Sequence, residues 1–78
     1  MRLDKYLKVS RLIKRRTVAN EACDAEKVLV NGKAARASYE VKTGDIIEIM
    51  IGKSLKVRVL DIKEYTKKDD AAALYEVV

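Results

Sequence analysis

Apolar residues recur at near-helical spacing in the first third of the chain. Leu3 and Leu7 lie four positions apart, as neighbours on one face of a helix do. The pattern predicts two short helices, with a break near Val9 and Ser10 and with the second helix over residues 14–25. Four side chains of this second helix are expected to face inward: Val18, Ala19, Ala22 and Cys23.

A different pattern, with a period of two, begins at Val28. Val28 and Val30 alternate with Leu29 and lead into Asn31-Gly32. Asn-Gly tolerates positive φ at both positions, so this pair favours the tight turn whose twist suits a β-hairpin. We therefore predict a hairpin whose returning strand spans Lys33 to Arg36.

The second half of the chain consists of β-prone runs separated by turn signals. Residues 46–51 are strongly β-prone and lie between two such signals, Gly44-Asp45 and Gly52-Lys53. Residues 55–59 alternate apolar and charged side chains, as in a strand with one face in water. The remaining expectations are a bent continuation of that strand to Tyr65, a polar loop over residues 66–70 and a last strand over residues 72–78.

The order of helices first and strands afterwards predicts an α+β fold. We expect two to three short N-terminal helices packed on a small twisted antiparallel sheet. A chain of 78 residues allows one domain, over residues 1–78, and no proline, repeat or linker divides it. No apolar run approaches the roughly 20 residues that a membrane span needs. With a charged opening unlike a signal peptide and a single cysteine, the chain is expected in the cytoplasm, away from membranes.

Positive charge is concentrated in the first half of the chain. Residues 1–36 carry ten Lys or Arg against four Asp or Glu, a net charge of +6, whereas residues 37–78 carry seven against eight, a net charge of −1. Such asymmetry indicates a polyanionic partner, because Lys and Arg near phosphates release condensed counterions. A merely solvated basic face is the alternative, and composition does not separate the two.

Catalytic chemistry is poorly supplied. The chain has no histidine, so the usual general base near neutral pH and a common zinc ligand are both absent. Cys23 therefore has no histidine partner and is expected to be a small core residue. The glycines Gly32, Gly44 and Gly52 are isolated turn formers and do not compose a phosphate-binding loop. We expect no enzyme, no metal and no cofactor.

A basic cluster is the most informative feature of the first half. Arg11, Lys14 and Arg15 are spaced i, i+3, i+4, so on a shared helix they would project from one side, and Arg16 follows at once. Packing of the two helices would extend this surface with three cations of the first helix, Arg2, Lys5 and Lys8. Arginine suits such a surface because its planar fork binds phosphate oxygens in pairs.

The few aromatic residues bear on the kind of nucleic acid. The chain has four tyrosines and neither Trp nor Phe, which argues against a platform that stacks single-stranded bases. The pattern favours phosphate-directed recognition of folded, helical RNA. Asp4, an acidic residue within the basic stretch, is expected to interact with the start of the first helix, to orient a neighbouring arginine, or both.

Four segments together resemble a known family. In order they read RLDKYL, SRLIKRRTVA, KVLVNGK and VKTGDIIEI, and they extend from about Arg2 to Ile49. They closely resemble the RNA-binding domain first described in ribosomal small-subunit protein S-four, also called the αL RNA-binding motif. The resemblance implies two helices on a small antiparallel sheet that present basic residues to structured RNA. It places the motif core at about residues 2–51 and leaves residues 52–78 as a C-terminal strand extension.

Within that family, the short chain and its opening MRLDKYLKVSRLIKRRTVA resemble stand-alone bacterial members that associate with ribosomes, namely quality-control factors and a small heat-shock protein. This resemblance implies binding to ribosomal RNA of the large subunit when a peptidyl-tRNA obstructs it. It further implies that the factor helps to hold the tRNA while alanine tails are added to the stalled chain. The implied partners are large-subunit ribosomal RNA, the large ribosomal subunit and tRNA, and the expected state is a monomer.

The resemblance also assigns candidate contacts residue by residue. Four arginines are expected to touch RNA phosphates: Arg2, Arg11, Arg15 and Arg16. Leu3 and Leu7 are expected in the core instead. The full set of candidate RNA-binding residues is Arg2, Asp4, Lys5, Lys8, Arg11, Lys14, Arg15, Arg16, Lys27, Asn31, Lys33 and Arg36.

Two positions depart from the family pattern. A glycine usually ends the second helix where this chain has Ala25-Glu26-Lys27, and a left-handed glutamate there costs about 1 kcal/mol, so either Glu26 is strained or the helix ends differently. Many relatives carry a capping Ser or Thr where Arg15 stands, so Arg15 gives up a cap and adds a charge.

Two other functions fit parts of the pattern. The chain resembles the recognition domain that pseudouridine synthases and other RNA-modifying enzymes often carry, which would require a catalytic domain elsewhere. A protein-interaction module would use the apolar sheet, with the basic residues serving for solvation only. A steep loss of RNA affinity with rising salt separates phosphate recognition from this last function.

Overall fold

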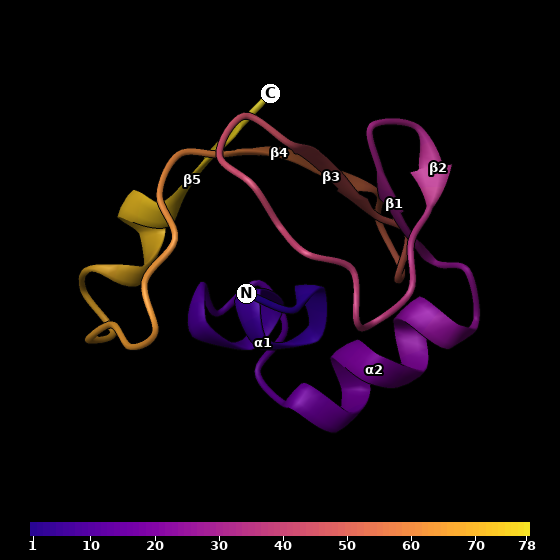
Figure 1. The fold of residues 1–78 in the computed structure, drawn as a ribbon, viewed down its shortest axis with the longest axis horizontal. Coiled ribbons are helices and arrows are strands. Elements are labelled where there is room, and N and C mark those ends of the chain that lie inside the picture. Colours follow the sequence, from indigo (N-terminus) through magenta and orange to yellow (C-terminus); the bar gives the residue numbers. More distant parts are fainter.

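Two helices cover one face of a five-stranded antiparallel sheet in the computed structural model, which describes residues 1–78 (Figure 1). The strand order is β2-β1-β3-β4-β5. The elements are α1 (Leu3–Val9), α2 (Arg16–Asp24), β1 (Val28–Val30), β2 (Lys33–Ala34), β3 (Ile46–Ile49), β4 (Leu55–Val59), the 3-10 helix η1 (Ala71–Leu74) and β5 (Tyr75–Val77). The expected α+β architecture is confirmed. None of the helices has the length and apolar character needed to cross a membrane.

The predicted hairpin forms around Asn31-Gly32. Asn31 and Gly32 have φ of 53° and 85°, and the flanking Val30 and Lys33 are paired across the turn. The returning strand β2 ends at Ala34, so the expectation that it reaches Arg36 is wrong. The N–H of Ala35 still donates to the Val28 carbonyl at 3.1 Å, and the chain then leaves the sheet and crosses to the first helix.

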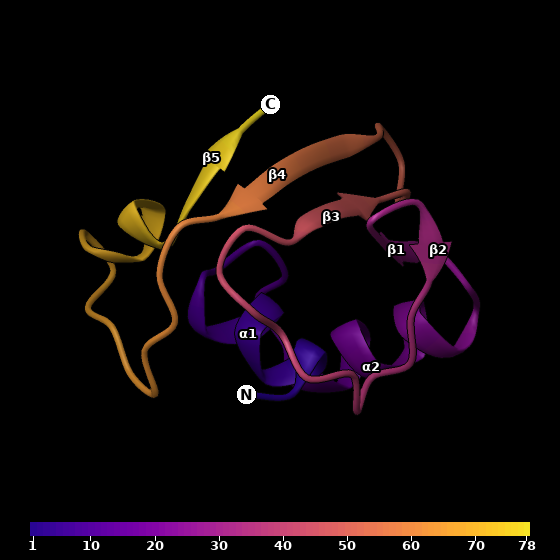
Figure 2. The same ribbon diagram turned by 45° about the horizontal axis from the view of Figure 1, so that its top comes forward.

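That segment, between β2 and β3, runs past the start of the chain before it returns to the sheet (Figure 2). The carbonyls of Tyr39 and Ala37 accept hydrogen bonds from the N–H groups of Leu3 and Asp4, at 2.8 and 3.2 Å. The N–H of Val41 donates in turn to the Met1 carbonyl at 2.9 Å. The first N–H groups of α1 are thus satisfied by main chain from a distant segment, with no side-chain cap.

A buried carboxylate, Asp45, ties this segment to the hairpin. Its oxygens accept hydrogen bonds from the Asn31 amide at 3.1 Å, the Tyr39 hydroxyl at 2.9 Å and the Lys42 N–H at 2.9 Å. The Asn31 side-chain oxygen accepts the N–H of Ile46 at 3.0 Å. Burial on its own raises the pKa of Asp45, but the hydrogen bonds from Lys42, Asn31 and Tyr39 outweigh it and lower that pKa.

The core lies between the helices and the inner face of the sheet. Leu3 and Leu7 are fully buried, as expected. The predicted inward face of α2 is right for Ala19, Ala22 and Cys23 and wrong for Val18, which is 41% exposed. Val18 precedes Ala19 by one residue, about 100° around the helix, and so it falls at the margin of the buried stripe.

The C-terminal segment departs from the expected course. β4 ends at Val59 and does not continue to Tyr65, because the N–H groups of Leu60 and Asp61 donate to the Leu74 carbonyl, at 2.8 and 3.2 Å. Residues 71–74 form η1 in place of the start of a strand, and β5 then pairs with β4. The Leu74 carbonyl also accepts a hydrogen bond from the buried Tyr6 hydroxyl at 2.8 Å. This bond joins α1 to the end of the chain.

The end of α2 resolves the question of the missing glycine. Glu26 has φ of 59°, the left-handed conformation that glycine adopts at this position. The N–H groups of Glu26 and Lys27 donate to the carbonyls of Cys23 and Ala22, at 3.0 and 2.9 Å, which completes the usual left-handed helix ending. Glu26 therefore holds the strained backbone conformation, and the helix ends as it does with glycine.

Replacing Glu26 by glycine is expected to stabilise the protein by about 1 kcal/mol, because glycine adopts this backbone conformation without steric cost. Glu21→Gly, at an exposed position inside the same helix, is the matched control and is expected to cost about 1 kcal/mol. Urea unfolding followed by circular dichroism measures both. Equal losses from the two substitutions would contradict the prediction.

Candidate nucleic-acid interface

The basic cluster of the sequence lies mostly outside α2. Arg11, Lys14 and Arg15 do not share a helix, and the expectation that the second helix starts at residue 14 is wrong, because α2 begins at Arg16. Arg11 lies in the turn after α1 with φ of 63°, and Arg15 is the extended residue before α2, with no side-chain capping bond. A turn with a left-handed arginine, and not a helical face, therefore presents these cations.

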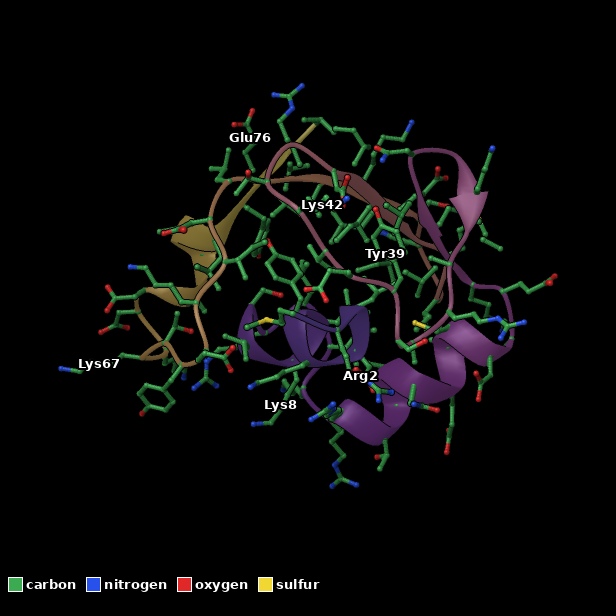
Figure 3. The ribbon with its side chains drawn as sticks, viewed as in Figure 1. Arg2, Lys8, Tyr39, Lys42, Lys67 and Glu76 are labelled. Carbon is green, nitrogen blue, oxygen red and sulfur yellow. The ribbon has the colours of Figure 1, made fainter.

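The turn and α1 form one wall of a groove of about 880 Å³, here called the basic groove. The other wall is the segment over residues 64–68. Six cations line the groove: Lys5, Lys8, Arg11, Lys14, Arg16 and Lys68. Figure 3 shows Lys8 on the side of α1 away from the sheet and Arg2 where α1 and α2 meet. The structure thus brings five of the predicted residues together with Lys68, which sequence reasoning did not select.

Two contacts hold the C-terminal wall against α1. Lys5 forms an ion pair with Glu64, and the Thr66 hydroxyl donates to the Val9 carbonyl at 3.0 Å. The hydrogen bond and charge of Lys5 lower the pKa of Glu64. Tyr65 lies between these two anchors and is 79% exposed. Sequence reasoning treated this segment as a strand end and a polar loop, and the only local signals were two lysines and a tyrosine.

Beside the groove, a buried carboxylate joins the starts of both helices. The side chain of Asp4 is 3% exposed and accepts hydrogen bonds from Arg2 Nε at 3.2 Å, Arg2 Nη2 at 3.3 Å and Asn20 Nδ2 at 3.3 Å. Arg16 reaches it through Nε at 3.4 Å and Nη2 at 3.5 Å. The N–H of Lys5 also donates to Asp4, at 2.8 Å. Asp4 therefore both orients two arginines and serves the first turn of α1.

The electrostatics of Asp4 follow from these contacts. Burial on its own raises the pKa of Asp4, but the hydrogen bonds from Asn20, Arg16 and Arg2 outweigh it and hold the pKa below its usual value. The carboxylate is thus ionised at neutral pH. The side chains of Arg2 and Arg16 remain 51% and 45% exposed, so part of each guanidinium faces solvent.

A second groove, of about 470 Å³, is lined by Arg2. Arg36 lines it from the segment after β2, and Cys23 lines it from α2. Burial, with smaller contributions from Asp4 and Asp24, raises the pKa of the Cys23 thiol to about 11. The thiol therefore stays protonated at neutral pH, as a core residue does. Thiol and carboxylate side chains form no group of three or more that could hold a metal ion.

Apart from the buried Asp4, the predicted residues that line neither groove are Arg15, Lys27, Asn31 and Lys33. All four are exposed. Both polar atoms of the Asn31 side chain are engaged within the fold, with Asp45 and with the N–H of Ile46. Asn31 thus supports the hairpin, whereas the three cations flank the grooves.

Comparison with known proteins places this geometry in a family. The model of a family described as the S4 domain matches residues 1–47. A protein named RQC P-site tRNA stabilizing factor from Streptococcus pneumoniae is 56% identical to the chain, and the match covers 100% of the chain and 90% of that protein. A protein of the same name from Bacillus subtilis is 49% identical, with 100% of the chain and 92% of that protein covered.

A solved structure shows the same fold. The trimeric structure of Vibrio cholerae Heat Shock Protein 15 superposes with a TM-score of 0.93 at 28% identity, and it covers 100% of this chain and 81% of that chain. The resemblance drawn from the four sequence segments is therefore confirmed. By its family match and by the identity of these relatives, the chain belongs to the S4 domain family.

Proposed function

We propose that the chain is a non-catalytic factor that binds ribosomal RNA of the large subunit and P-site tRNA in ribosome quality control. The observation that carries the proposal is the pair of half-exposed arginines, Arg2 and Arg16, held by the buried Asp4. A guanidinium already oriented by a carboxylate loses less side-chain freedom when it binds a phosphate. The exposed part of each fork offers its remaining donors to phosphate oxygens.

The basic groove extends the proposed contact surface from these arginines. The proposed phosphate contacts are Arg2, Lys5, Lys8, Arg11, Lys14 and Arg16, flanked by Arg15, Lys27, Lys33 and Arg36. Asp4 and Asn31 are positioning residues, because their polar atoms are engaged by the protein. This density of cations suits a folded RNA, whose phosphates lie close together on its surface.

The names of the relatives support the biological setting. Two relatives at 56% and 49% identity are named for stabilising a P-site tRNA in RQC, and each is matched over at least 90% of its own length. We extend that role to this chain, acting in the cytoplasm as a monomer. The Vibrio cholerae relative forms a trimer in its structure, so sedimentation of the free chain is the direct test of the monomer.

Replacing Arg2 and Arg16 together by glutamine is expected to abolish co-sedimentation with bacterial large ribosomal subunits in a sucrose gradient. Glutamine removes both charges but keeps a polar amide at each position, and circular dichroism checks that the variant is folded. For a ribosomal RNA fragment, the steepness of the decrease of log affinity with log salt should become smaller by about two.

The matched control is Lys56→Gln with Arg58→Gln. Both are exposed residues of β4 that alternate with buried Val57, so they lie on the face of the sheet away from the helices. This control removes the same charge and should sediment as the wild type does. A native-like circular dichroism spectrum together with undiminished sedimentation of the Arg2/Arg16 variant would sink the proposal.

Asp4→Asn is expected to weaken RNA binding, although it raises the net charge from +5 to +6. Long-range electrostatics alone predicts tighter binding, whereas loss of the carboxylate releases both arginines from their orientation. Asp24→Asn makes the same charge change at an exposed position of α2 and should bind at least as tightly as the wild type. Titration at pH 7 and fixed salt measures both, and equal or tighter binding by Asp4→Asn contradicts the orienting role.

The contribution of Asp4 to stability is expected to depend on pH. Because its folded pKa is lowered, the ionised carboxylate stabilises the protein above the ordinary Asp pKa of about 3.9. That stability is lost as the pH falls through the lowered folded pKa. Asp4→Asn should therefore cost about 2 kcal/mol at pH 7 and progressively less in strong acid. Urea unfolding of both proteins from pH 7 to pH 2 measures the difference between their free energies of unfolding. A difference that did not change with pH would contradict the prediction.

A further inference from the structure

Tyr65 is the one aromatic side chain of the basic groove. It is 79% exposed, whereas Tyr6 is fully buried and Tyr39 and Tyr75 are partly buried. A tyrosine exposed to this degree leaves most of its ring in water, and no hydrogen bond within the protein engages its hydroxyl. The ring is thus available to a ligand that enters the groove.

The position of Tyr65 is set by the residues on either side of it. Glu64 pairs with Lys5 of α1, and the Thr66 hydroxyl donates to the carbonyl that ends α1, at 3.0 Å. These two anchors, one residue before and one after, hold the main chain of Tyr65 against the helix. Less backbone freedom is then lost when a ligand stacks on the ring.

Cations line the same groove as this ring. Lys8 lies on α1, Arg11 in the following turn and Lys68 on the same wall as Tyr65. Figure 3 shows Lys8 directed away from the sheet. It also shows Lys67, which precedes Lys68 in the sequence, extending away from the molecule. Lys68 lines the groove and Lys67 does not. An aromatic face among several cations is the combination that binds a nucleotide, with the base on the ring and the phosphate on the cations.

We propose that the basic groove takes one unpaired nucleotide of the bound RNA, with its base stacked on Tyr65 and its phosphate held by Lys68, Lys8 and Arg11. The inference rests on the proposed RNA-binding function and names the RNA feature that this part of the surface recognises. Bases inside a helix are stacked on one another and offer no free face, so the ring selects a bulged or looped base. A single exposed ring accommodates a single base.

Two RNA hairpins test the inference with the full chain. They share one stem sequence, and one of them carries a single unpaired 2-aminopurine, a base whose fluorescence falls when it stacks. The wild type is expected to bind the bulged hairpin about tenfold more tightly than the paired one, and to quench the 2-aminopurine. Tyr65→Ala should remove both effects while it leaves the affinity for the paired hairpin unchanged.

Conservative and neighbouring substitutions separate stacking from other roles. Tyr65→Phe keeps the ring and should retain the preference and the quenching. Lys68→Ala should lower the slope of log affinity against log salt by about one, whereas Lys67→Ala, the matched control, should lower it less. Tyr65→Ala should leave that slope unchanged, because it removes no charge.

The outcomes distinguish the two proposals. Equal binding of both hairpins by the wild type, or retention of preference and quenching by Tyr65→Ala, overturns the nucleotide site and leaves the proposed function standing. An equal loss of affinity for both hairpins in Tyr65→Ala also overturns the nucleotide site, since the ring would then act through the fold. Failure of the wild type to bind either hairpin or large ribosomal subunits overturns the proposed function itself. Weaker binding of Tyr65→Ala to large subunits with an unchanged hairpin preference assigns the ring to a protein contact and overturns the site.

Discussion

The buried carboxylate of Asp4 is the interaction on which the arrangement of this molecule depends. It lies in the first turn of α1 and contacts Arg16 and Asn20 of α2, so it fixes how the two helices meet. A lone buried carboxylate would be unstable, and its surroundings supply the guanidinium, amide and main-chain donors that compensate for lost water. The same contacts that satisfy the carboxylate place two guanidinium groups at the surface. Helix packing and the electrostatics of the interface therefore have one origin.

Sequence patterns predicted the elements whose causes are local. Asn31-Gly32 specified its turn because both residues tolerate positive φ, and the alternation in residues 55–59 specified which side chains of β4 are buried. Patterns failed where the cause is distant. The end of β4 depends on the Leu74 carbonyl, which accepts the N–H groups of Leu60 and Asp61 from across the fold. The start of α2 at Arg16 follows a turn with a left-handed Arg11, which helical periodicity does not reveal.

The candidate site shows the same division. Charge counting and the family resemblance identified Lys5, Lys8, Arg11, Lys14 and Arg16, all of which line the basic groove. Neither could find Tyr65 or Lys68, because long-range contacts bring their segment to α1. Glu64 pairs with Lys5, 59 positions earlier, and Thr66 bonds to Val9, 57 positions earlier. The role of Asp4 was accessible from sequence as an acid among bases. Its second arginine partner was not, because Arg16 is twelve residues away and lies on the other helix.

The hydrogen bond from Tyr6 to Leu74 has a consequence for where the folding unit ends. The family match stops at residue 47, whereas Tyr6, fully buried inside that match, donates its hydroxyl to a carbonyl 68 positions later. β4, which lies beyond the match, also supplies Val57 and Val59 to the core, and β4 and β5 complete the sheet. A fragment cut at the family boundary would end within β3, would lose the core residue Ile49 and would remove the acceptor of the Tyr6 hydroxyl. In this chain the segment that matches the family is therefore shorter than the segment that builds the core and the sheet.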